Sequence, residues 1–438
     1  MPSVIIIGGG LAGLSAAAAL GGAGWQVDLF ETRAFLGGRA TSWPVAGEES
    51  EVIDNCQHVL LRCCNNLLDF YKRLGVDRKI RFYPEYYFLE PGGRKSVLKR
   101  GMLPPPLHFA GSFAGLRFLT LSDKAAIARA MLAIPKERHR ADLDSITMLQ
   151  WLQEKRQTAG AIERYWRQVL VSAINEELDR MAASHGLQVF WLGMLQSARG
   201  YEMGIPDVPL RELYSETALG KLGNVTLHGR SPAAALEVSG DRVKCLQAGD
   251  QFYTADHYIS AVPSERLGAL APFLDFKSEP FEHSPITGIH LWFDRSITDL
   301  PHATLLDRTI HWMFNKSEGR YVQVVASASR SLTNMGRPEI IELAVRELAE
   351  FFPMITAAKL ERAQVIKEVR ATFSAKPGLE LLRPMAETRI SNFSLAGDWT
   401  RSGWPATMEG AVRSGYLAAE AAARAEGVKS HFLIADAA

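Results

Sequence analysis

The first pattern along the chain is a run of β-branched apolar residues that ends at glycine. Residues 4–7 read VIII, and residues 8–10 are all glycine. A run without a polar position is typical of a strand buried on both faces of a parallel sheet. An alanine-rich stretch follows from Leu11 to about Leu20, and a second apolar run covers Val27 to Phe30. The pattern therefore predicts a strand–helix–strand unit.

The glycines between the first strand and the helix have the spacing G-x-G-x-x-G. Gly8 permits a tight turn, Gly10 lets the backbone approach a pyrophosphate, and Gly13 lets the helix pack closely on the strand. The N–H groups at the helix start, at Leu11 and Ala12, would face the phosphates. This loop predicts a nucleotide site.

An acidic residue supports the same interpretation. Glu31 follows the second strand, about 20 residues after the loop, where a carboxylate can accept hydrogen bonds from a ribose. The alternative is an ordinary strand–helix–strand turn, which leaves Glu31 unexplained.

The same order of elements returns near the other end of the chain. Residues 394–422 predict a strand, a loop at Gly397-Asp398 and a helix that opens at Thr407–Ala411. A helix N-terminus carries partial positive charge. Between the two ends, residues 224–263 predict short strands separated by S-G-D and A-G-D turns.

Composition narrows the class of protein. The 438 residues are enough for two or three domains, and 49 basic against 48 acidic residues give no reason to expect a nucleic-acid partner. The four cysteines, at 56, 63, 64 and 245, form neither a disulfide framework nor a C-x-x-C metal pair, so we expect a reduced cytoplasmic chain without a metal. Cys63 and Cys64 are expected in a helix. Neither a signal peptide nor a transmembrane helix is expected.

A second glycine pair distinguishes the nucleotide. Gly37-Gly38-Arg39 lies just past the ribose acid, which suits a long ligand whose diphosphate and sugar alcohol continue past the first loop. NAD sites in ordinary dehydrogenases do not need this second loop. With this pair, the chain resembles the amine oxidase and phytoene desaturase superfamily of FAD enzymes. The resemblance implies FAD contacts at Gly8, Gly10, Leu11, Ala12, Gly13, Glu31, Arg33, Gly38, Arg39, Ala40, Gln57, Val262, Gly397, Asp398, Thr407, Met408 and Ala411.

The resemblance also implies an α/β fold, in which an α+β substrate domain is inserted into a Rossmann-like FAD domain. We expect the FAD domain at 1–78, 220–275 and 388–426, the substrate domain at 79–219 and 276–387, and a C-terminal tail at 427–438.

Three stretches resemble one branch of the superfamily. Residues 54–76, 284–298 and 403–415 are similar to the hydroxysqualene dehydroxylases of hopanoid synthesis, although Cys56 stands where glycine is usual. The resemblance implies reduction of hydroxysqualene to squalene, a C30 isoprenoid, by loss of water and hydride delivery from reduced flavin. The electron donor would be external. The alternatives are a carotenoid-type desaturase or isomerase, an amine oxidase, and a flavin-binding scaffold without catalysis.

The candidate proton donors are two histidines. Residues 288, 290 and 292 share one face of a predicted strand, which would show Gly288, His290 and Trp292 to the flavin. In amine oxidases the slot of Gly288 holds a lysine, and its loss would free room for a bulky substrate. His58 lies in the first of the three stretches. Each histidine can serve either as a proton donor or as a structural hydrogen-bonding group.

An apolar stretch bears on localisation. Residues 101–121 include Leu103, Leu107, Phe109, Phe113, Leu116 and Phe118 but little charge. They would either rest on the cytoplasmic face of a membrane as a peripheral contact or line the core of the substrate domain.

Overall fold

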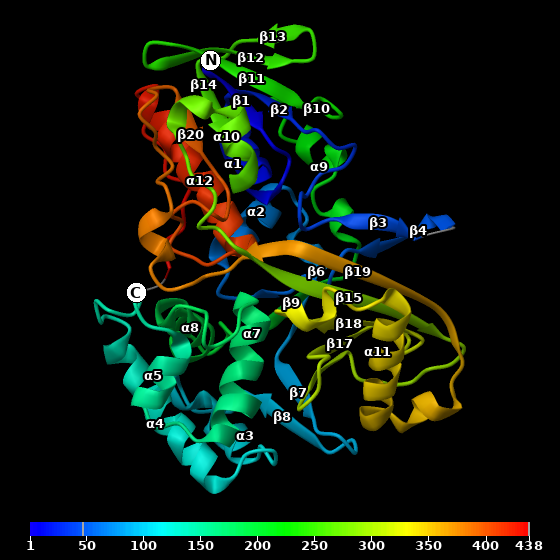
Figure 1. Cartoon of the computed structure of the whole chain (residues 1–438). Helices are drawn as coiled ribbons and strands as arrows, with labels where there is room; N and C mark the ends of the chain where they lie inside the picture. Colours follow the sequence, from blue (N-terminus) through cyan, green and yellow to red (C-terminus); the bar gives the residue numbers. More distant parts are fainter. Residues whose placement is uncertain (46–47, 437–438) are drawn as a thin grey trace.

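A parallel sheet forms the upper part of the molecule (Figure 1). The computed structural model describes residues 1–45 and 48–436. The strand order is β10-β2-β1-β14-β20, and every neighbouring pair is parallel. The strands are β1 (Ser3–Ile7), β2 (Gln26–Phe30), β10 (Val225–His228), β14 (His257–Ser260) and β20 (Phe393–Leu395). The mixed α/β architecture that the sequence predicts is confirmed.

Two helices pack together beside this sheet. They are α1 (Leu11–Gly22) and α12 (Met408–Ala425), from opposite ends of the chain. They approach so closely that a Cβ on Gly415 would lie 2.2 Å from the carbonyl oxygen of Ala12. This contact explains why α1 is alanine-rich, since larger side chains would hold the helices apart. The five strands and both helices come from the three segments expected for the FAD domain.

A small antiparallel sheet lies at the outer end of this region (Figure 1). It has the order β11-β12-β13. Its strands are β11 (Ala233–Ser239), β12 (Arg242–Ala248) and β13 (Gln251–Tyr253). Gly240 and Gly249 have φ of 64° and 60° at the two predicted turns.

The second large sheet has seven strands in the order β19-β15-β18-β17-β16-β7-β8. Helix α11 (Arg337–Phe351) packs beside β19. The strands are β7 (Glu85–Leu89), β8 (Lys95–Lys99), β15 (His283–Phe293), β16 (His302–Leu305), β17 (Trp312–Ser317), β18 (Tyr321–Ala326) and β19 (Leu360–Phe373).

Helices and two smaller sheets complete the fold. The smaller sheets pair β3 (Ser42–Val45) with β4 (Glu48–Asp54), and β5 (Leu60–Leu61) and β6 (Ile80–Tyr83) with β9 (Met203–Pro206). The remaining α-helices are α2 (Asn65–Arg73), α3 (Ala110–Ala114), α4 (Leu121–Glu137), α5 (Met148–Glu154), α6 (Ala159–Ala161), α7 (Gln168–Ile174), α8 (Ala183–Phe190), α9 (Glu216–Gly220) and α10 (Ser264–Leu270). Ile162–Arg167 and Trp191–Leu195 are π-helical. Within the described ranges, no helix is long and apolar enough to cross a membrane.

One sequence prediction differs from the structure. Cys63 and Cys64 precede α2 instead of lying inside a helix, and Cys63 is only half-buried. The described part of the C-terminal tail, to residue 436, is fixed to the fold. The N–H groups of Phe432 and Leu433 donate to the Glu420 carboxylate at 2.7 and 2.8 Å, and Ile434 N–H donates to Asn66 Oδ1 at 2.8 Å.

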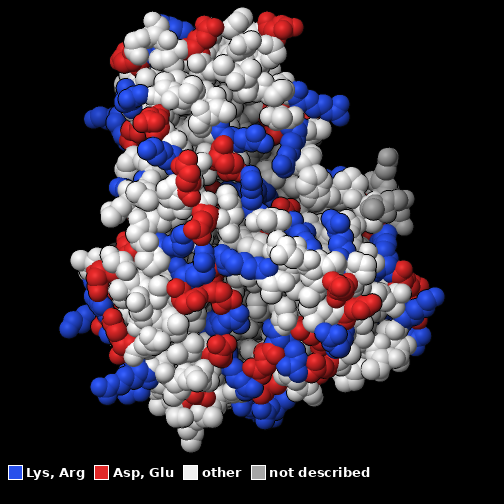
Figure 2. All heavy atoms as spheres, in the orientation of Figure 1, with Lys and Arg blue, Asp and Glu red and all other residues white. Residues whose placement is uncertain are grey.

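The stretch 101–121 divides between the two environments expected for it. Leu116 and Phe118 are buried in the core, and Phe109 and Phe113 pack partly against it. For Leu116 and Phe118 the structure supports the core alternative, and the partial burial of Phe109 and Phe113 favours it for them too. Leu103 and Leu107 are exposed, together with Met102. The visible face of the molecule carries basic and acidic side chains mixed together (Figure 2), as the balanced composition indicates.

Candidate active site

The predicted cofactor residues meet at one edge of the parallel sheet. Gly8 follows β1, Glu31 follows β2, Val262 follows β14 by two residues, and Gly397 follows β20 by two residues. Because all these strands run in the same direction, their carboxyl ends lie at one edge, where doubly wound sheets bind their ligands. Segments more than 350 residues apart in the chain thus converge there, since Arg39 and Asp398 are 359 positions apart and in contact.

Two of the three glycines in the first loop lie where a side chain would not fit. Gly8 has φ of 115°, and a Cβ there would lie 2.7 Å from the Ala261 carbonyl oxygen. A Cβ on Gly13 would lie 1.9 Å from the Gly8 carbonyl oxygen. At Gly10 the nearest atom to a Cβ is 3.9 Å away, so this position is open on the outside of the loop. These are the turn, the close packing and the open approach that a dinucleotide loop requires.

Donors and an acceptor surround the open side of the loop. The N-terminus of α1 has no side-chain cap, so its first N–H groups, at Leu11 and Ala12, are available to an anion. The Glu31 carboxylate accepts from Gly9 N–H at 2.8 Å and from Arg33 N–H at 2.7 Å, which fixes it beside the loop. The arrangement fits a nucleotide diphosphate and its ribose.

The second glycine pair lies directly on the first loop. Gly37 N–H donates to the Gly9 carbonyl oxygen at 2.8 Å, and a Cβ on Gly38 would lie 3.1 Å from Gly10 Cα. The next residue, Arg39, pairs with the buried Asp398 at 2.5 Å. A ligand that leaves the first loop therefore meets Gly38, Arg39 and Asp398 next, in agreement with the length of FAD.

The N-terminus of α12 completes the cofactor region. The hydroxyl of Thr407 caps the helix by accepting from Gly410 N–H at 3.0 Å. Met408 and Ala411 are half-buried on the first turn. Three other predicted contacts have partners within the protein. The carbonyl oxygen of Val262 accepts a hydrogen bond from Trp399 Nε1 at 3.0 Å, and Ala40 is buried under Tyr214. Arg33 is exposed, and its guanidinium lies 5.5 Å from the centre of the Phe35 ring. Their contact with FAD stays a prediction.

An apolar cavity of about 240 Å³ begins beside these residues. Its lining includes Gln57, Thr407 and Met408 as well as Phe88 and Leu98. Four of its lining residues are neighbours across adjacent strands of the seven-stranded sheet and form one row. Thr304 pairs with Phe88 on one side and with Trp312 on the other, and Trp312 pairs with Val325. Val325 pairs in turn with Gly288.

Gly288 lies at the end of that row, but its missing side chain does not leave space for a substrate. A Cβ there would be 3.0 Å from the Asn55 carbonyl oxygen and 3.5 Å from Cys56 Cα. The backbone of the stretch 54–58 therefore occupies the space that we expected a substrate to gain. Asn55 holds this stretch in place, because its Nδ2 donates to the Arg39 carbonyl oxygen at 2.8 Å and to Glu368 Oε1 at 3.0 Å.

The structure gives His290 a structural environment. The side chain is fully buried, its Nδ1 is 2.7 Å from the Tyr321 hydroxyl, and its Nε2 is 3.3 Å from Gln323 Nε2. Burial lowers its pKa to about 3, so the ring is neutral at physiological pH. His290 is not among the residues that line the cavity. Its neighbour on the same face, Trp292, stacks on Tyr321 at 4.5 Å. This placement favours the structural alternative for His290.

His58 lies closer to the cavity but also has a fixed partner. Its Nε2 is 2.9 Å from Asn55 Oδ1, and burial lowers its pKa to about 4. The adjacent Gln57 lines the cavity, and its Oε1 accepts from Lys316 Nζ at 3.0 Å. Lys316 was not predicted. It stands in the polar half of a strand that reads WMFNKS, and only the tertiary fold brings it to residues 54–58.

A buried carboxylate at the cavity wall was also missed. Glu409, on the first turn of α12, accepts from Asn66 N–H at 3.1 Å, Asn66 Nδ2 at 2.8 Å and Leu67 N–H at 2.7 Å. Burial nevertheless raises its pKa to about 7. The signal in the sequence was an acid among small and apolar residues at a helix start. Glu409 thus joins α12 to the N-terminus of α2 beside the cavity.

Comparisons with known proteins agree with this geometry. The 15-cis-phytoene desaturase of an Oncidium hybrid cultivar is 27% identical over 457 residues, covering 95% of this chain and 77% of the relative. The zeta-carotene desaturase of a Synechocystis species is 24% identical, covering 95% and 96%. Among solved structures, an oxidoreductase from Methanosarcina mazei has a TM-score of 0.70 at 17% identity, covering 94% and 98%. A putrescine oxidase has a TM-score of 0.72 at 15% identity, covering 97% and 98%.

The family model for flavin-containing amine oxidoreductases matches residues 11–423, which include the start of the helix after the first glycine loop and the predicted contacts from Gly397 to Ala411. The chain belongs to this family and is an FAD-dependent oxidoreductase.

Proposed function

We propose that this oxidoreductase acts on a long, linear isoprenoid. The observation that carries the proposal is the cavity, which is lined by the predicted flavin contacts Gln57 and Met408 together with mainly apolar side chains, Phe88 and Leu98 among them. Bound FAD supplies hydride transfer. The chain itself supplies a water-poor channel, in which a hydrocarbon is bound because its burial is favourable by about 25 cal/mol per Å². The resemblance places Gly288 in the slot where amine oxidases have lysine, which disfavours amines as substrates.

The first candidate reaction is carotenoid-type desaturation. The relatives named as phytoene and zeta-carotene desaturases match along nearly the whole chain, and their printed names give polyene substrates. In this reaction the chain would hold two adjacent saturated carbons at the flavin end of the cavity and let one proton depart. No strong acid is needed. The neutral, hydrogen-bonded state of His58 and His290 is compatible with that requirement.

The second candidate is dehydroxylation of hydroxysqualene to squalene, with an external electron donor. The observation that favours it is Glu409, a carboxyl with a pKa of about 7 on the wall of the apolar cavity. An allylic hydroxyl departs as water only when it is protonated or strongly hydrogen-bonded. A carboxyl that is partly protonated near neutral pH suits that task. The resemblance of residues 54–76 to the hydroxysqualene dehydroxylases supports the same candidate.

One purified preparation distinguishes the candidates. Oxidised enzyme with phytoene and a quinone acceptor should form conjugated polyenes, seen by absorbance, if the first candidate is correct. Anaerobically photoreduced enzyme with hydroxysqualene should be reoxidised and form squalene if the second is correct. Oxidation of putrescine without turnover of either isoprenoid would refute the proposal as a whole.

We also propose that the enzyme is cytoplasmic and rests on a membrane surface. Met102, Leu103 and Leu107 expose 102%, 53% and 54% of their surface in one short segment. The segment lies next to the cavity, because Phe109 packs on Tyr201 with ring centroids 4.7 Å apart and Tyr201 lines the cavity. A membrane-dissolved isoprenoid could pass from the bilayer to the cavity at this point.

A further inference from the structure

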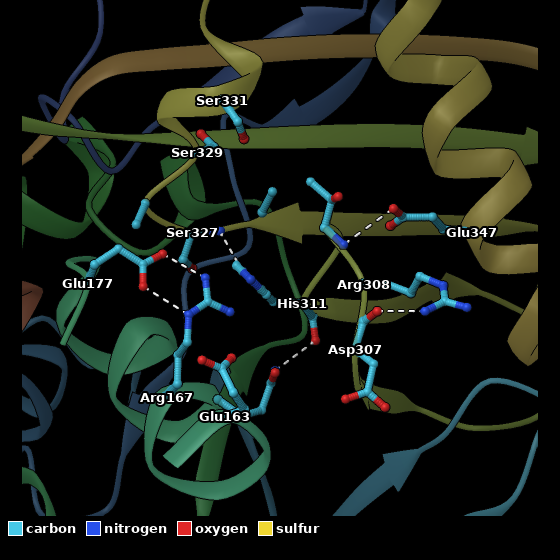
Figure 3. A pocket seen from close by; sticks show the side chains of 14 residues that line it. Glu163, Arg167, Glu177, Asp307, Arg308, His311, Ser327, Ser329, Ser331 and Glu347 are labelled. Carbon is cyan, nitrogen blue, oxygen red and sulfur yellow. Dashed lines mark hydrogen bonds and ion pairs between the residues drawn. The ribbon is translucent and has the colours of Figure 1, made fainter. Parts of the chain in front are cut away.

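A second cavity, of about 490 Å³, is lined by polar groups (Figure 3). It shares lining residues with the apolar cavity. It is bounded by the helical segment from Ile162 to Ile174, by residues 307–311 and by residues 326–331. Its charged lining side chains are Glu163, Arg167, Glu177, Asp307, Arg308 and Glu347. A cavity lined in this way holds water, in contrast to the apolar cavity beside it.

Two residues line both cavities. Gln168, at the start of α7, and Ser327, just after β18, contribute to the walls of the apolar and the polar cavity alike. A hydrogen-bonded unit joins them through His311. Gln168 Nε2 donates to the His311 carbonyl oxygen at 3.3 Å, and Ser327 N–H donates to His311 Nδ1 at 3.1 Å. Gln168, Ser327 and the His311 that joins them therefore lie at the boundary between the two cavities.

The tautomer of His311 follows from its contacts. Nδ1 accepts a hydrogen bond from a backbone N–H, so the neutral ring carries its proton on Nε2. Among the described residues, none bonds to Nε2, to Gln168 Oε1 or to Ser327 Oγ, and none of these atoms is fully buried. Three exchangeable or accepting groups thus lie together in the wall, free to bind water.

Both candidate reactions move one proton into or out of the apolar cavity in each turnover. In desaturation the substrate loses a hydride to the flavin and a proton, and the proton must leave the apolar cavity. In dehydroxylation the substrate gains a hydride from the reduced flavin, and its hydroxyl leaves with one proton as water. An apolar cavity that excludes bulk water therefore requires a polar route for one proton per turnover.

We propose that Gln168, His311 and Ser327 form that route, a wall that passes protons and single water molecules between the polar cavity and the apolar cavity. The inference rests on the proposed function, because it assigns the route to isoprenoid turnover. The three residues are positioning residues, since none is placed at the flavin. The polar cavity is the water reservoir on the solvent side.

The first test removes the Nε2 proton of His311 and retains the hydrogen bond that holds Ser327 in place. His311→Asn retains an acceptor for Ser327 N–H near the position of Nδ1 and removes the Nε2 proton. We expect single-turnover oxidation or reduction of the flavin by the active isoprenoid to slow by about 10²-fold, the low end of what a positioned proton donor contributes. The solvent deuterium isotope effect should rise while isoprenoid affinity is retained. Thr309→Val, in the same cavity, is the matched control. An unchanged rate and isotope effect in His311→Asn would overturn the proposal.

The second test does not depend on turnover. Ser327→Cys should react with a charged methanethiosulfonate reagent, as should Ser331→Cys at the exposed rim of the polar cavity. Geranylgeraniol, whose binding is followed by tryptophan fluorescence, should slow the labelling of Ser327→Cys alone. Labelling of residue 331 but not 327, or labelling of 327 that bound geranylgeraniol does not slow, would refute a shared wall. If no isoprenoid turns over, the proposed function fails, and this labelling still decides whether the route exists.

Discussion

Arg39 and Asp398, 359 positions apart in the chain, form an ion pair with Nη2 and Oδ1 2.5 Å apart. Arg39 also donates to the Ala371 carbonyl oxygen on β19 at 3.2 Å. The pair therefore links the second glycine loop to the turn after β20 and to the seven-stranded sheet. These contacts hold the flavin end of the site in shape through side chains that the ligand itself is expected to touch.

The first prediction concerns cofactor retention. Glu31→Ala removes the acceptor for two backbone N–H groups and for the expected ribose, and Asp398→Ala removes the partner of Arg39 and the expected ribityl contact. Each loss should cost about 1.5–3 kcal/mol of binding free energy, or one to two decades in FAD affinity. The ratio of flavin to protein absorbance after purification measures it. Glu361→Ala, at an exposed position on β19, is the control and should keep its FAD. Full occupancy in both site variants would remove the basis of the assignment.

The second prediction tests the close packing of α1. Gly13→Ala places a Cβ 1.9 Å from the Gly8 carbonyl oxygen, so the helix must move away from the strand. We expect a loss of about 1–3 kcal/mol in the free energy of unfolding, together with weaker FAD binding. Gly22→Ala in the same helix meets no atom within 4 Å and should be neutral or slightly stabilising. Equal melting temperatures for the two variants would contradict the close contact.

The sequence predicts the cofactor edge well because its signals are local. A β-branched run, a glycine turn and an acid at a fixed offset each depend on neighbouring residues, and the structure has β1, α1 and β2 where they are expected. The helix after residue 407 was predicted for the same reason. Position along one strand also predicted that Gly288, His290 and Trp292 share a face.

What lies against that face could not be predicted. Whether Gly288 meets open space or the Asn55 backbone depends on how residues 54–58 cross β15, which is a tertiary contact. The pairing of Lys316 with Gln57 depends on strand register in the same way. Leu103 is exposed and Leu116 is buried, although both are leucines in one apolar stretch. Composition does not distinguish an exposed leucine from a buried one.

The third prediction concerns acid stability. His302 is fully buried, neither ring nitrogen has a partner among the described residues, and burial lowers its pKa to about 4. The unfolded chain binds a proton near pH 6.5 and the folded chain near pH 4. The contribution of His302 to stability is therefore complete above pH 6.5 and is lost as the pH falls toward 4. Between pH 7.5 and pH 5 the wild type should therefore lose about 2 kcal/mol of its free energy of unfolding through His302, and the His302→Phe variant should not show this loss.

Urea unfolding of the FAD-loaded enzyme at pH 7.5 and at pH 5 measures this difference. His139→Gln, at an exposed position, is the control and should leave the pH dependence unchanged. If His302→Phe loses as much stability between the two pH values as the wild type, His302 is not a source of the acid sensitivity.

The last prediction concerns the membrane. Met102, Leu103 and Leu107 are exposed, and each apolar side chain that enters a bilayer is worth about 1.5–3 kcal/mol, so two or three suffice for reversible binding. The triple change of these residues to serine should reduce flotation with phosphatidylcholine liposomes and leave the flavin spectrum intact, because the FAD residues lie elsewhere. High salt should barely change wild-type binding, since screening weakens charge attraction and not apolar burial. The contrasting triple variant Phe109→Ser, Phe113→Ser, Leu116→Ser should instead unfold at lower temperature, because Leu116 is buried in the core and the two phenylalanines pack against it. Undiminished flotation of the first variant would place the membrane contact on another surface.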